Sequence, residues 1–196
     1  FKIDWKDIQY NLALRGCGFA YLANAASATS QGFDLQATTR VGPMTVNANV
    51  AYTKAEFSET LLGPPSPTNG TRALLANKGD NLGIPDWNVA VGAQYDFSIA
   101  DRKAYVRADY LYTGKYMRTP GVGTTSYDAI INDGEATATV NARAGVTVGA
   151  IDYSLFAQNL TNTDEFINKG HGNRSAVVTG TTFRPRTIGV QARLKF

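Results

Sequence analysis

The side chains best suited to chemistry lie in segments rich in Gly, Pro, Ser, Thr and Asn. His171 is the only histidine of the chain and stands between Gly170 and Gly172. An imidazole can contact a metal chelate, but a lone histidine without clustered partners is more often solvated. Four carboxylates of these segments lack the spacing of a metal-binding loop, so we interpret them as surface charges. They are Asp80, Asp128, Asp133 and Glu135. The sequence predicts no metal site.

Motifs of catalysis and cofactor binding are absent from the sequence. It contains no Walker loop, no GxGxxG after a strand, no HExxH and no nucleophile elbow. Cys17 is the only cysteine, so it cannot form an internal disulfide, and no second cysteine lies nearby to complete a metal site. We therefore expect neither an enzyme nor a bound cofactor.

Basic and aromatic residues of the same segments are the candidates for binding a ligand. Basic side chains can attract an anionic molecule by charge steering, and tyrosine rings can stack on a ligand. The alternatives are plain solubility for the basic residues and mutual packing for the tyrosines. The candidate contact residues are Arg72, Lys78, Tyr116, Arg118, Tyr127, His171 and Arg174.

The overall charge narrows the class of protein. The 196 residues carry a formal net charge of +3, and the basic residues are scattered rather than clustered. Nucleic-acid binding is therefore not indicated. No run of residues approaches the ~18 consecutive apolar positions of a transmembrane helix.

Alternation with a period of two residues recurs along the chain and predicts strands with two unlike faces. In the last strand Ile188, Val190 and Ala192 share an apolar face, whereas Gln191 and Arg193 share a polar one. About eight such strands are expected, with a bulge near Asp7 in the first. Their approximate ranges are 1–12, 33–40, 44–53, 87–97, 105–112, 138–148, 151–158 and 187–196.

The connections between these strands alternate in length. Residues 41–43, 99–102 and 149–150 form tight turns, whereas residues 13–30, 58–85, 117–135 and 163–184 form long loops. Short turns at one end and long loops at the other are typical of an outer-membrane barrel. Aromatic residues near the strand ends match the girdles of such barrels at the membrane interfaces. These residues are Tyr52, Trp87, Phe97, Tyr110, Tyr112 and Phe196. The charged opposite faces suit a wide, polar lumen, because unpaired charges are costly in a dry core.

Several motifs, in order, resemble the C-terminal portion of TonB-dependent receptors. Residues 24–35 (NAASATSQGFDL) are similar to the family stretch NAGxAxSxGFELE, and residues 51–55 (AYTKA) to AYTxA. Residues 79–87 approach a strand as the family does, although Gly83 stands where the family has a proline. The remaining motifs are residues 1–9, 107–110, 141–145, 155–162 and 185–196. Together they cover essentially the whole chain.

This resemblance implies an all-β, antiparallel transmembrane barrel of about 22 strands, closed by an N-terminal plug. We expect residues 1–196 to be the C-terminal part of the barrel domain, with the signal peptide and the plug outside this sequence. Such receptors import iron–siderophore chelates, cobalamin, nickel or carbohydrates, using energy from the TonB complex. The implied location is the bacterial outer membrane, among lipid and lipopolysaccharide, and Phe196 resembles the signal read by the barrel-assembly machinery. Lipopolysaccharide phosphates are a further alternative partner for the basic loop residues.

Two other readings remain open from the residues alone. The chain can be a small, self-contained eight-stranded outer-membrane barrel with an adhesin or structural role. It can also be a soluble antiparallel sandwich or barrel, although this reading leaves the alternation of short turns and long loops unexplained.

Overall fold

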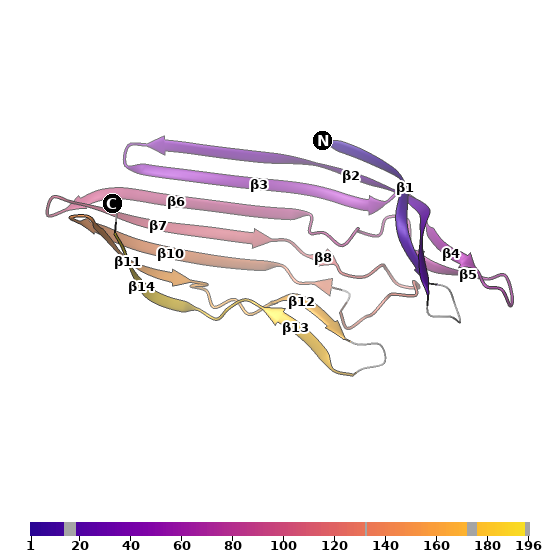
Figure 1. The fold of residues 1–196 in the computed structure, drawn as a ribbon. Coiled ribbons are helices and arrows are strands. Elements are labelled where there is room, and N and C mark those ends of the chain that lie inside the picture. The colour runs from indigo at the N-terminus through magenta and orange to yellow at the C-terminus, as the bar shows by residue number, and fades with distance from the viewer. Residues whose placement is uncertain (14–18, 132, 172–175, 195–196) are drawn as a thin grey trace. The chain divides into compact units, whose positions relative to one another are not determined.

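A computed structural model describes residues 1–13, 19–131, 133–171 and 176–194, and the regular structure in this part of the chain consists of β-strands (Figure 1). The strands are β1 Lys2–Ala13, β2 Ala20–Val41, β3 Met44–Phe57, β4 Leu61–Pro65, β5 Arg72–Ala76, β6 Trp87–Ile99, β7 Arg102–Thr113, β8 Tyr116–Met117, β9 Asp133–Gly134, β10 Thr137–Val148, β11 Ile151–Gln158, β12 Phe166–His171, β13 Val178–Thr182 and β14 Thr187–Leu194. Within these residues, no helix has the length and apolar character needed to span a membrane.

Eight strands form one antiparallel sheet, in the order β1-β2-β3-β6-β7-β10-β11-β14. The expected all-β, antiparallel fold with about eight long strands is therefore confirmed. The other strands pair two by two as β4 with β5, β8 with β9, and β12 with β13. These three hairpins lie in segments that the sequence predicts as long loops.

The residues group into two compact units. Unit 1 comprises Phe1–Phe33, Tyr52–Asp86 and Lys115–Gly134, and unit 2 comprises Asp34–Ala51, Trp87–Gly114 and Glu135–Phe196.

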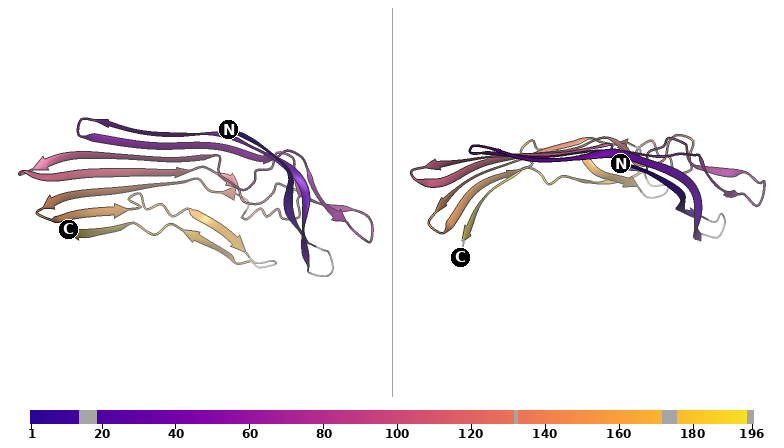
Figure 2. Two further views of the ribbon diagram at one scale, coloured as in Figure 1. Left: turned by 45° about the horizontal axis from the view of Figure 1, so that its top comes forward. Right: turned by 90° about the horizontal axis from the view of Figure 1, so that it is seen from above.

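Unit 2 contains the three tight turns that the sequence predicts. Ala100 and Asp101 both have positive φ, at 47° and 61°, which is the geometry of a two-residue type I′ hairpin turn. Gly42 and Gly149 supply the positive φ of the other two turns. The strands β6, β7, β10 and β11 then pair in continuous register without a bulge. Figure 2 shows these strands and β14 lying side by side as a single layer.

Unit 1 carries a small hydrophobic core. Phe57, Leu61 and Ala76 are buried together, and Leu75 and Leu82 pack against them. Strand β1 joins this core through Ile8, and Asp7 beside it has a φ of 56° at a break in the β1–β2 register. The bulge predicted near Asp7 is therefore confirmed.

The boundary predicted for the second strand is wrong. Residues 13–30 were expected to form a long loop, but β2 begins at Ala20 and pairs with β1 from Ala13↔Ala20 to Lys2↔Gln31. The early part of β2 is rich in Ala and Ser, so its two faces differ little in hydropathy and the alternation is hidden. Residues 14–18 lie outside the described part.

Candidate functional site

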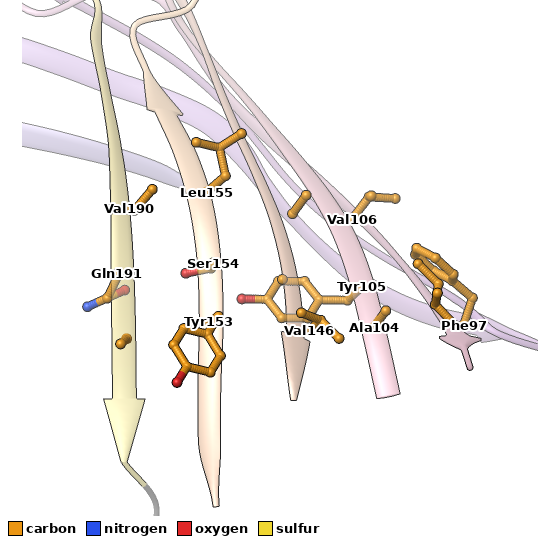
Figure 3. Close-up of a pocket in the computed structure, with 14 residues that line it drawn as sticks. Phe97, Ala104, Tyr105, Val106, Val146, Tyr153, Ser154, Leu155, Val190 and Gln191 are labelled. Atoms are coloured by element: carbon orange, nitrogen blue, oxygen red, sulfur yellow. The ribbon is translucent and has the colours of Figure 1, made fainter. Parts of the chain in front are cut away.

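One face of the sheet in unit 2 is apolar and exposed. A cross-strand row on this face contains Tyr95, Val106, Ala144, Leu155 and Val190. Val190 is 83% exposed and Leu155 is 55% exposed, which is unusual for aliphatic side chains in a row. The next row, toward the tight turns, helps to line a hollow of about 610 Å³ (Figure 3). A continuous apolar surface of this kind requires an apolar environment.

The opposite face of the same strands is polar and internally bonded. Arg107 Nε donates to Asp109 Oδ2 at 2.9 Å, and Arg107 Nη2 donates to Asp109 Oδ1 at 2.5 Å. This pair lies over Gly92, where an added Cβ would come within 2.6 Å of Asp109 Oδ1. Glycine at position 92 therefore leaves the room in which the ion pair sits against the backbone.

Arg143 bonds on the polar face to uncharged groups. Its Nη1 donates to Ser154 Oγ at 3.0 Å and to Gln191 Oε1 at 2.6 Å, so one guanidinium links β10, β11 and β14. The guanidinium carbon also lies 5.4 Å from the centre of the Phe156 ring. These contacts orient the charge but do not neutralise it.

Aromatic rings on the polar face cover glycines of the neighbouring strands. Tyr105 lies over Gly145, where an added Cβ would be 2.5 Å from the ring, and Phe156 lies over Gly189 at 2.6 Å. Both are directly paired positions of adjacent strands. Aromatic cover of a strand glycine helps to hold the register of the pair.

The predicted aromatic girdle residues lie near the ends of their strands in unit 2. Trp87 begins β6, and Tyr112 precedes Thr113, the last residue of β7. Phe97 lies at the other end of β6, paired with Ala104 beside the tight turn. Tyr52 belongs to unit 1, where its ring centre is 6.0 Å from that of Phe33. Phe196 lies outside the described residues.

A hydrogen-bonded asparagine fixes the loop end of β11. Asn159 is 6% exposed and has a φ of 48°. Its backbone N–H donates to Asn141 Oδ1 at 3.0 Å, and its carbonyl accepts from the N–H of Asn162 at 2.9 Å. Its side-chain amide donates to the carbonyls of Thr163, at 2.8 Å, and Arg184, at 3.0 Å. Asparagine tolerates this left-handed backbone better than most residues. Asn159 thus connects the two ends of the segment between β11 and β14.

Asp80 performs a similar role in unit 1. It is 9% exposed, and its Oδ2 accepts from the backbone N–H groups of Asn77 and Gly121, both at 2.8 Å. It therefore joins the segment after β5 to the segment after β8. Interpreting Asp80 as a surface charge is wrong, because the sequence does not reveal that Gly121 returns to it.

The predicted contact residues are only partly brought together. Arg118 lies over the ring of Tyr116, with its guanidinium carbon 5.2 Å from the ring centre. Arg72 Nε donates to the Gly63 carbonyl within the β4–β5 hairpin, and Lys78 is exposed after β5. Tyr127 is half-buried in unit 1. The side chain of His171 and the whole of Arg174 lie outside the described residues, so their contact roles stay predictions.

The part of the chain that the structure describes contains no cluster of side chains suited to bind a metal ion. No group of three His, Cys, Asp or Glu side chains there could hold a metal ion. Glu135, another predicted surface charge, pairs with Lys169 and accepts from the N–H of Phe166 at 3.1 Å.

The sheet of unit 2 has the features of a membrane-embedded sheet: an exposed apolar face, a polar face and tight turns at one end. A family model described as TonB dependent receptor-like, beta-barrel, matches residues 1–162. The chain therefore belongs to the TonB-dependent receptor β-barrel family, which confirms the resemblance seen in its motifs. Proteins of this family are receptors and transporters of the bacterial outer membrane. Comparison with curated proteins gives no match.

Proposed function

We propose that this chain forms the C-terminal part of an outer-membrane receptor that captures a scarce solute and imports it with energy from the TonB complex. The observation that carries the proposal is the two-faced sheet of unit 2. Its apolar face suits lipid and its polar face suits the wall of a water-filled lumen. Family membership adds the class of receptor and the energy source.

The solute that best agrees with the side chains is an anionic iron–siderophore chelate. Arg72, Lys78 and Arg118 lie in unit 1, in segments that include hairpins beyond the long strands. Basic groups raise the local concentration of an anionic molecule and accelerate its capture. Tyr116 and Tyr127 add aromatic surface on which a chelate can stack.

The surroundings of the receptor follow from the same proposal. Outer-membrane lipid and lipopolysaccharide cover the apolar face, and the barrel-assembly machinery inserts the barrel, reading the terminal strand with Phe196. Contact with TonB is made by N-terminal parts of the receptor outside this sequence.

Uptake should require both the receptor and TonB. Cells that express the intact receptor and a functional TonB are expected to accumulate ⁵⁵Fe from a ferric chelate that the receptor binds, at least about tenfold above cells lacking either protein. The measurement is cell-associated ⁵⁵Fe over time, across a panel of anionic and neutral chelates. The control is surface binding at 0 °C, which should persist without TonB. Equal uptake in cells lacking TonB contradicts the proposal.

A further inference from the structure

The polar face of unit 2 contains a hollow of about 250 Å³ with several arginines in its lining. The lining residues come from β6, β7, β10, β11 and β14. They are Gln94, Tyr105, Arg107, Arg143, Asp152, Ser154, Gln191 and Arg193. Three of these side chains are cationic and one is anionic. A polar hollow with that balance favours a ligand of negative charge.

Arg143 has a second arginine of the hollow as its cross-strand neighbour. It pairs directly with Arg107, so two guanidiniums start from opposite positions of adjacent strands. Like charges directly opposite each other destabilise a sheet unless an anion lies nearby. Arg107 has such an anion in Asp109, which it binds through two nitrogens.

Among the described residues, Arg143 forms no ion pair with a carboxylate. Ser154 and Gln191 accept from its Nη1. A guanidinium carries five N–H donors in a rigid fork that suits bidentate binding of a carboxylate or phosphate. Held by neutral groups through one nitrogen, Arg143 keeps its charge and other donors for a ligand.

The neighbouring hollow does not remove the excess of positive charge. It shares Tyr105 and Asp152 with the 250 Å³ hollow. Its other charged lining residues are two cations, Arg40 and Lys103, and one carboxylate, Asp96. Counting both hollows together with Asp109, cations still outnumber carboxylates. The excess is therefore a property of this part of the polar face, in which Arg107 is paired with Asp109 and Arg143 is bonded to neutral groups.

We propose that this hollow, centred on Arg143, binds the carboxylate or phosphate group of an anionic solute inside the lumen. The inference rests on the proposed function, because it assigns the solute a negative charge and a contact on the polar face of unit 2. Phe156 and Gln191 orient the guanidinium. Arg193, on β14 beyond β11, adds a second positive charge opposite Asp152.

The test is direct binding of two probes, citrate and inorganic phosphate, to the purified intact receptor at constant ionic strength. Isothermal titration calorimetry should detect saturable binding to the wild type. Arg143→Gln should weaken the affinity about tenfold or more, since it removes a charge-assisted hydrogen bond. Arg143→Lys keeps the charge without the fork and should bind with intermediate affinity. Lys54→Gln, which breaks an exposed pair with Glu56 in unit 1, should bind as the wild type does.

Either of two results overturns the proposal: no saturable binding of citrate or phosphate to the wild type, or equal affinity in Arg143→Gln and Lys54→Gln. Circular dichroism and gel mobility of each variant report whether it is folded, and Arg143→Lys serves as the second variant if Arg143→Gln does not assemble. The outcome is independent of energised import. If the wild type does not bind either anion but shows TonB-dependent uptake, this site alone is rejected, whereas TonB-independent uptake rejects the proposed function.

Discussion

Replacing Gly32 with alanine should sharply reduce the amount of folded receptor. A Cβ at position 32 would lie 1.8 Å from the carbonyl oxygen of Tyr52 and 3.0 Å from the Cα of Thr53. Both are backbone atoms, so no side-chain rotation relieves the clash and β2 must move away from β3. We expect a loss of about 3 kcal/mol, at the upper end of overpacking costs. Heat-modifiable mobility on gels and the thermal midpoint measure the effect.

Gly170→Ala is the matched control for this substitution. Gly170 also lies in a strand, but nothing lies within 4 Å of a Cβ added there. The control should therefore assemble and melt as the wild type does. If Gly32→Ala and Gly170→Ala have the same midpoint, the close approach of β2 to β3 in unit 1 is wrong.

A charge placed on the apolar face of β14 should be nearly as damaging. Val190→Arg puts a guanidinium on a face that we assign to lipid, at a cost of about 2–4 kcal/mol near the middle of the bilayer. Gln191→Glu adds a charge one residue further along, on the opposite face. The new carboxylate lies next to Arg143 Nη1, which already donates to Gln191 Oε1 at 2.6 Å. The free energy of unfolding should therefore be unchanged or higher.

The measurement for this pair is urea unfolding of the intact receptor in lipid vesicles, followed by tryptophan fluorescence. The expected order of stability places Gln191→Glu at or above the wild type and Val190→Arg well below it. An opposite order would mean that the two faces of β14 have been assigned the wrong way round.

The faces of the strands were predictable because they depend on neighbours in sequence. Ile188, Val190 and Ala192 alternate with Gln191 and Arg193, and alternation alone places them on opposite sides of β14. The tight turns were predictable for the same reason, since each spans only a few residues. The early part of β2 was not predictable, because its small side chains give both faces a similar hydropathy.

The contacts of the functional surfaces were less accessible to sequence reasoning. Arg143 stands 11 residues from Ser154 and 48 from Gln191, so its partners appear only once β10, β11 and β14 are in register. Asp80 and Gly121 are separated by 41 residues. The alternation in the sequence does place Arg143 and Gln191 on the polar faces of their strands. It therefore predicts the face on which the 250 Å³ hollow lies, but not which residues meet there.

We infer that one face of this sheet contacts lipid and the other contacts water. The most direct test attaches a nitroxide spin label, one position at a time, to residues 188–193 of the intact receptor in bilayers, with Cys17 replaced by serine. Positions 188, 190 and 192 should collide mainly with oxygen, which concentrates in lipid, and positions 191 and 193 mainly with a water-soluble nickel chelate. A period of two residues in this phase supports a barrel wall. Equal exposure of both faces to the nickel chelate would contradict it.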